Sequence, residues 1–193
     1  CCSLREVRVC GDGSFAGEGI FNRVNADLAK DIGNLAQRSL SMIGKNGDAT
    51  LPTPQDLTAE DEAMLALFDG LKAQTDAAVQ GHELHNYLAA VMDGVSEANR
   101  YFAAQEPWAL KKTDPTRMGT VLYVTAETVR QAALLLQPVI PEGAAKLLDY
   151  LLVADEARSF AHLGADNRLT PGLALPTPQG VFPRLSMAES EAE

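Results

Sequence analysis

Apolar residues recur every three or four positions along most of this 193-residue chain, and this spacing constrains its fold more than any other feature. Such a period places apolar side chains on one face of an α-helix, whereas the alternation typical of strands is scarce. The clearest apolar face is formed by Phe21, Val24, Leu28, Ile32, Leu35 and Met42. The sequence therefore predicts an all-α helical bundle.

Residues that start and stop helices divide this pattern into about five main helices. Asp114 and Pro115 form a strong start, because Asp can cap free backbone amides and Pro at the first helical position gives up only an unused donor. Thr58 with Asp61 is a weaker relative of the capping box. The expected helices are residues 21–43, 58–80, 84–106, 115–137 and 141–152.

Three regions are expected along the chain. Residues 1–19 contain several glycines and are interpreted as an irregular connector, and residues 20–163 as the helical bundle. Residues 164–193 are rich in Pro and Gly, which cannot sustain a helix, so an extended tail is expected there. Apolar residues in this tail predict that it packs onto another part of the protein, and they are Leu173, Leu175, Val181 and Phe182.

Composition restricts the surroundings in which this chain can work. No apolar run approaches the roughly 20 residues that a membrane span requires. The three cysteines all lie near the N-terminus and by themselves form neither a disulfide framework nor a paired zinc site. We therefore expect a cytoplasmic protein with no membrane partner.

The distribution of charge restricts how the chain can bind nucleic acid. The formal net charge of −10 argues against non-specific binding, because attraction to phosphate supplies most of that affinity. Any RNA site must therefore be local. One basic island does occur, around Trp108, where Lys111, Lys112 and Arg117 outnumber Glu106 and Asp114.

Several stretches of the chain resemble, in order and spacing, the anticodon-binding domain of bacterial methionyl-tRNA synthetases. The resemblance covers about residues 14–185. The stretches that carry it are Asn25-Ala26-Asp27-Leu28, Gly33-Asn34-Leu35-Ala36-Gln37-Arg38, Ala98-Asn99-Arg100-Tyr101, Pro107-Trp108-Ala109-Leu110-Lys111 and Val181-Phe182-Pro183-Arg184-Leu185. The resemblance implies an α-helical domain that recognises the CAU anticodon of methionine tRNA.

The resemblance also implies which residues would contact RNA. In the family, the positions that match Asn34 and Arg38 read the first anticodon base, a cytosine, and the tryptophan that matches Trp108 stacks on it. The two helix residues lie four apart and so project from the same side. Lys111 and Lys112 are expected to bind the RNA backbone. Without the resemblance, an Asn and an Arg at this spacing are ordinarily a solvated helix face, and a single Trp is ordinarily part of the core.

Two further cations, Lys45 and Arg117, are weaker candidates for contacts to phosphate, with solvated surface as the alternative interpretation. At residues 8–10 the chain has Arg, Val and Cys where the family has Pro, Phe and Gly. This departure and the acidic balance argue for a rival hypothesis, in which a stand-alone paralogue uses the bundle for protein association or regulation. The presence of Asn34, Arg38 and Trp108 argues more strongly for RNA binding.

No catalytic constellation is recognisable in the sequence. The His-x-Gly-His-like element and the Lys-Met-Ser-Lys-Ser-like loop of a class I synthetase are both missing. We therefore expect a chain separated from its catalytic half, with no catalytic residue and no cofactor of its own. ATP, methionine and zinc would belong to that other half. The expected partners are methionine tRNA, through its anticodon loop, and a separate catalytic synthetase domain.

Overall fold

The computed structural model describes residues 31–46 and 49–176, and all its regular elements are helical. The all-α prediction is confirmed. Six α-helices lie in this part of the chain: α3 (Gly33–Asn46), α4 (Ala59–Gln80), α5 (Leu84–Gln105), α6 (Pro107–Thr113), α7 (Pro115–Leu136) and α8 (Pro141–Tyr150). Three single 3-10 turns follow, namely η2 (Asp155–Ala157), η3 (Phe160–His162) and η4 (Ala165–Asn167).

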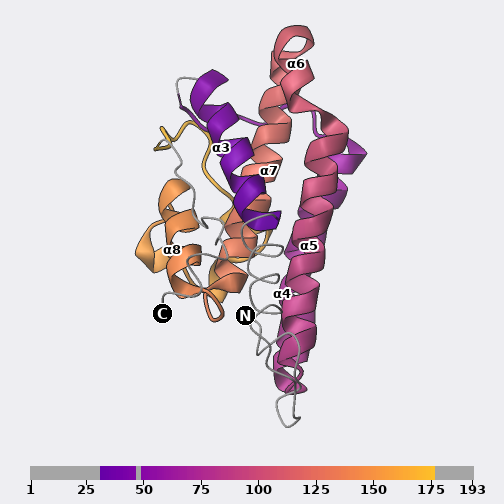
Figure 1. Ribbon diagram of the computed structural model, residues 1–193, viewed down its shortest axis with the longest axis vertical. Coiled ribbons are helices and arrows are strands. Elements are labelled where there is room, and N and C mark those ends of the chain that lie inside the picture. Colours follow the sequence, from indigo (N-terminus) through magenta and orange to yellow (C-terminus); the bar gives the residue numbers. More distant parts are fainter. Residues whose placement is uncertain (1–30, 47–48, 177–193) are drawn as a thin grey trace, which may run out of the picture.

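Helix α7 forms the centre of the bundle. All of its residues from Thr120 to Leu136 are buried, so it is enclosed on every side. Helices α3, α4, α5 and α8 all pack against it, and α6 lies above its N-terminal end in Figure 1. A helix buried all round normally lacks charged residues. Here Glu127 and Arg130 are buried, but they pair with each other through two hydrogen bonds.

Helices α4 and α5 form the long pair at one side of the bundle (Figure 1). Helix α4 begins at a complete capping box. The Thr58 hydroxyl accepts a hydrogen bond from the backbone N–H of Asp61 at 3.4 Å, and the Asp61 carboxylate accepts one from the backbone N–H of Thr58 at 2.9 Å. This pairing satisfies two amides that have no partner within the helix. The start predicted at Thr58 is confirmed.

Two sharp turns at the top of the bundle produce a helix that the periodicity did not predict. Helix α5 ends at Gln105, and Glu106 takes a left-handed conformation with φ 43°. Pro107 then begins the seven-residue helix α6. Asp114 separates α6 from α7 and caps α7, because its Oδ1 atom accepts a hydrogen bond from the backbone N–H of Arg117 at 2.9 Å.

The first predicted helix ends later than its glycines indicated. Helix α3 continues past Gly44 and ends at Asn46, whereas the predicted end was residue 43. The Asn46 side chain donates to the Met42 carbonyl at 2.8 Å, which satisfies an acceptor left free at the helix end. Lys45 in the last turn adds a favourable charge at the negative end of the helix dipole. The part of this predicted helix before residue 31 lies outside the described residues.

The segment after α8 packs back onto the loop before α4. Thr50 and Ala174 form an isolated antiparallel bridge, and the Leu51 backbone N–H donates to the Leu173 carbonyl at 2.8 Å. Leu175 is buried, as expected for a segment that packs onto the protein. The predicted connector and the predicted contacts of Val181 and Phe182 lie outside the described residues.

Within residues 31–46 and 49–176, no helix has both the length and the apolar character needed to cross a bilayer.

Candidate nucleic-acid interface

Arg38 brings together three helices at the upper end of the bundle. Its guanidinium carbon lies 5.0 Å from the centre of the Phe102 ring on α5 and 5.3 Å from the centre of the Trp108 ring on α6. The two rings are 6.0 Å apart and inclined at 58°. A guanidinium at this distance from an aromatic face is held by the negative charge of the ring face. Residues far apart in sequence therefore meet here, with Arg38 and Trp108 at the surface and the buried ring of Phe102 behind them.

Trp108 is not part of the core. Its side chain is 46% exposed, whereas Pro107 beside it is buried and anchors α6. Lys111 and Lys112 follow Trp108 by three and four residues on α6 and are both exposed. This spacing places them on the same side of the helix as the indole ring. Helix α6 thus presents a flat aromatic ring next to two positive charges.

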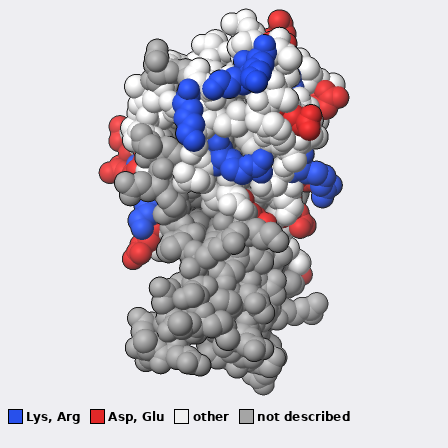
Figure 2. Space-filling view, turned by 45° about the horizontal axis from the view of Figure 1, so that its top comes forward, with Lys and Arg blue, Asp and Glu red and all other residues white. Residues whose placement is uncertain are grey.

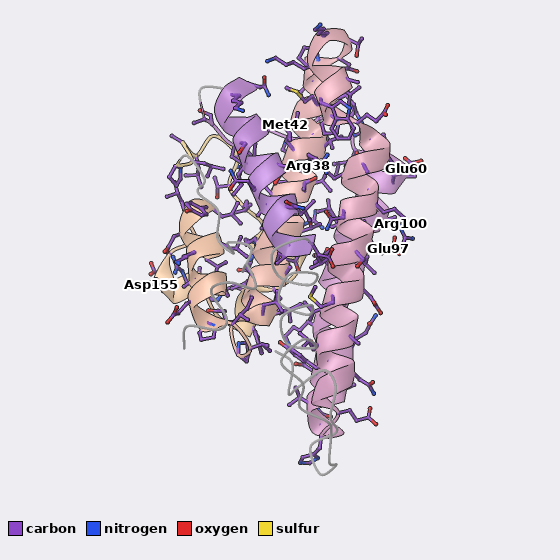
Figure 3. All side chains as sticks on the ribbon, in the orientation of Figure 1. Arg38, Met42, Glu60, Glu97, Arg100 and Asp155 are labelled. Atoms are coloured by element: carbon purple, nitrogen blue, oxygen red, sulfur yellow. The ribbon has the colours of Figure 1, made fainter. Side chains whose placement is uncertain are left out.

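Asn34 and Arg38 lie on the exposed side of α3. Both are exposed, whereas Leu35, Ala36 and Ser39 between and beside them are buried. Asn34 lies one turn nearer the start of the helix, and Met42 follows Arg38 by one turn in the other direction (Figure 3). The structure therefore brings Arg38 and Trp108 into contact and leaves Asn34 on the adjoining surface of α3.

The surface near this site is locally basic although the protein is acidic. In the view with the top of the bundle turned forward, Lys and Arg side chains gather near the middle of the face, and Asp and Glu side chains lie toward its edges (Figure 2). Lys45, in the last turn of α3, is also exposed. A local basic surface of this kind fits the expectation of a confined site.

Arg117 does not belong to this surface. The expectation that it contacts phosphate and the alternative that it lies in solvent are both wrong. Its side chain is only 17% exposed and forms an ion pair with Asp61, which is fully buried. Two guanidinium nitrogens bind the two carboxylate oxygens, one pair at 2.9 Å, and the Tyr101 hydroxyl donates to the same carboxylate. A buried carboxylate needs such partners, and this need turns Arg117 inward.

The environment of Asp61 affects its protonation. Burial by itself raises the pKa of the Asp61 carboxyl, but hydrogen bonds from Arg117, Tyr101 and the Thr58 backbone outweigh burial and leave that pKa below its ordinary value. Burial and the adjacent carboxylate raise the pKa of Tyr101. Asp61 is therefore ionised and Tyr101 neutral at neutral pH.

The lowered pKa of Asp61 predicts a pH-dependent contribution to stability. A group whose pKa is lower in the folded state stabilises the fold above its unfolded pKa, which is about 3.9 for Asp, and loses that contribution as the pH falls through the folded value. We expect the difference in free energy of unfolding between the natural chain and Asp61→Asn to be constant near neutrality and to shrink below about pH 4. Urea unfolding at a series of pH values measures this difference. A difference that stays the same at acid pH would contradict the expectation.

Sequence reasoning missed Phe102 as a part of the site. Its place on the apolar face of the third predicted helix identified it only as a core residue, and its side chain is indeed 1% exposed. Its ring nevertheless lies against Arg38. The available signal was its position at the end of that apolar face, five residues before the helix break at Pro107.

Comparison with known proteins identifies the family. A family model described as the anticodon binding domain of methionyl tRNA ligase matches residues 51–192. The methionine–tRNA ligase of Rhizobium meliloti (strain 1021) is 56% identical over 187 residues, which are 97% of this chain and 36% of that protein. The methionine–tRNA ligase of Mycobacterium tuberculosis (strain ATCC 25618 / H37Rv) is 50% identical over 185 residues, 94% of this chain and 35% of that protein.

Solved structures agree with these relatives. The apo crystal structure of Mycobacterium tuberculosis methionyl-tRNA synthetase has a TM-score of 0.91 at 49% identity, and the match covers 95% of this chain and 37% of that chain. The structure of the same enzyme bound by methionyl-adenylate has a TM-score of 0.89. The chain belongs to the family of anticodon-binding domains of methionyl-tRNA ligases. It spans roughly a third of the length of the relatives that it matches.

Proposed function

We propose that this chain binds the anticodon loop of methionine tRNA and selects the cytosine at the first position of the CAU anticodon. The observation that carries this proposal is the exposed ring of Trp108 held against Arg38, with Asn34 one turn nearer the start of α3 on the same side. Sequence-specific recognition of RNA usually uses unstacked bases that lie on an aromatic side chain and are read through their Watson–Crick edge. Trp108 supplies the aromatic ring, and Arg38 and Asn34 supply the groups that read the edge of the base.

The base stacks on Trp108, and its edge is read by Arg38 and Asn34. A cytosine edge has one amino donor and two acceptors, which suit a guanidinium that donates and an amide that both donates and accepts. Arg38 exchanges its contact with the indole ring for hydrogen bonds to the base, and the cation–π contact that it gives up is worth only about 0.5–1 kcal/mol at an exposed site. Uracil has a carbonyl in place of the amino group and leaves polar groups unpaired.

Lys111 and Lys112 bind the phosphate backbone beside the stacked base. Their charges are confined to one side of α6, so attraction to RNA is local and the acidic remainder of the protein disfavours binding elsewhere. Neither lysine reads a base, so both raise affinity without changing selectivity.

We also propose that methionine is activated outside this chain, with the ATP and zinc that the resemblance implies. The proposed location of the chain is the cytoplasm.

Base selection gives a direct test. We expect the protein to bind methionine tRNA more tightly than the same tRNA with uridine at the first anticodon position, by about tenfold, because one mispaired polar group costs on the order of 1–3 kcal/mol. Titration of labelled tRNA at low salt, followed by fluorescence anisotropy, measures both affinities. Low salt is needed because phosphate contacts weaken as salt rises.

Equal affinity for the two tRNAs would remove the case for reading of the first base. Absence of binding to either tRNA at low salt would refute RNA recognition altogether and would favour the rival hypothesis of association with another protein.

A further inference from the structure

The orientation of Trp108 depends on the elements that flank α6. This helix has seven residues, and a helix so short is not stable by itself in water. A single residue, Glu106, separates it from α5, and a single residue, Asp114, separates it from α7. Whatever fixes the end of α5 and the start of α7 therefore fixes the angle at which the indole ring is presented.

One side chain joins these two flanks. The Nη2 atom of Arg117, in the first turn of α7, donates to the Oε1 atom of Gln105 at 2.6 Å, and Gln105 is the last residue of α5. The backbone N–H of Arg117 donates to Asp114, the residue that follows α6. The residue that ends α5 and the residue that begins the turn into α7 are thus held by the same arginine.

Asp61 fixes this arginine from a third helix. Its carboxylate accepts hydrogen bonds from two guanidinium nitrogens of Arg117 and from the Tyr101 hydroxyl. Asp61 is fully buried at the start of α4. A fork of two parallel hydrogen bonds restricts the guanidinium more than a single contact does. With Asp61 on one side and Gln105 on the other, Arg117 has one defined position.

We propose that Asp61, Arg117 and Gln105 form a clamp that positions α6 and thereby sets the orientation of Trp108 beside Arg38. The left-handed backbone of Glu106 is a second observation in its favour, because a non-glycine residue with φ 43° persists only where its neighbours hold it. The clamp residues are positioning residues and do not touch RNA. The consequence for base selection rests on the proposed function, whereas the orientation of Trp108 does not.

The variant Gln105→Ala tests the clamp with little risk to the fold, because Gln105 is only half-buried and the Asp61–Arg117 pair remains. Trp108 is the single tryptophan of the chain, so intrinsic fluorescence reports on its surroundings alone. We expect Gln105→Ala in the 193-residue chain to move the emission to longer wavelength and to increase quenching by acrylamide. We also expect its preference for cytosine over uridine to fall about fivefold, the factor that corresponds to one net hydrogen bond.

Three further variants sharpen this test. Gln105→Glu keeps an acceptor for Arg117 and should show the same emission and quenching as the natural chain. Arg117→Lys keeps a positive charge near Asp61 but lacks the fork that also reaches Gln105, so it should reproduce the shift of Gln105→Ala. Gln80→Ala is the matched control, because Gln80 also ends a helix and is exposed. It should change nothing.

The outcomes separate this proposal from the proposed function. If the natural chain does not distinguish the two tRNAs but Gln105→Ala still alters Trp108 emission, the proposed function fails and the clamp is supported. If the natural chain selects cytosine while Gln105→Ala and Arg117→Lys leave emission, quenching and selectivity unchanged, the clamp is refuted and the proposed function stands.

Discussion

The variant Asp61→Asn is expected to lower the free energy of unfolding at neutral pH by about 3–5 kcal/mol, the usual cost of removing one partner from a buried ion pair. The amide has nearly the shape of the carboxylate, so the loss comes from charge and hydrogen bonding and not from a cavity. Arg117 would keep its positive charge at a largely buried position after losing the carboxylate of its ion pair. Tyr101 would also lose a charged acceptor, and the cap of α4 would weaken.

Urea unfolding followed by far-UV circular dichroism measures this loss. Asp93→Asn is the matched control, because Asp93 lies within α5 and is exposed. Changes at exposed positions of this kind usually stay within about 0.5 kcal/mol. A loss at Asp61 no larger than the loss at Asp93 would show that the buried pair does not hold the three helices together.

The variant Trp108→Ala is expected to weaken binding of methionine tRNA about thirtyfold, since stacking of one base on an aromatic ring contributes about 1–3 kcal/mol. Two effects combine at this position. The base loses its stacking surface, and Arg38 loses the ring that holds its guanidinium in place. Stability should change much less than binding, because the ring is 46% exposed and leaves no large cavity in the core.

Titration with labelled tRNA at low salt, combined with urea unfolding of the same variant, measures both quantities. Val79→Ala is a suitable control, since Val79 is an apolar residue of similar exposure, 48%, and lies at the C-terminal end of α4, away from the site. Natural affinity in Trp108→Ala would remove the indole ring from the mechanism. A large loss of stability would instead show that the ring acts through packing.

Local signals account for the parts of the fold that the sequence predicted well. The capping box at Thr58 and the Asp114–Pro115 start act over three residues, so they need no knowledge of the remaining chain. The end of α3 was predicted too early because glycine only weakens a helix, and the Asn46 side chain compensates at its C-terminus. Helix α6 was not predicted because seven residues are too few to show a period.

The candidate site, like the fold, was predicted in part from the sequence and in part could not be. Helical spacing places Asn34 and Arg38 on one side of α3, and resemblance to a known family singles out Trp108. Neither could show that Arg38 lies against both Trp108 and Phe102, because these two residues lie more than sixty positions further along the chain. The positions of these residues as binding groups stay predictions until RNA is titrated.

By itself, the sequence determined that this chain is an all-α bundle, where most of its helices begin, and which residues are candidates for binding RNA. Periodicity and caps operate within a few residues, and for that reason they are legible in sequence. Only the tertiary structure decided that Arg117 turns inward and that Trp108 stays outside. Asp61 lies on another helix and needs a positive partner once it is buried, so one cation of the predicted basic island, Arg117, became part of the interior.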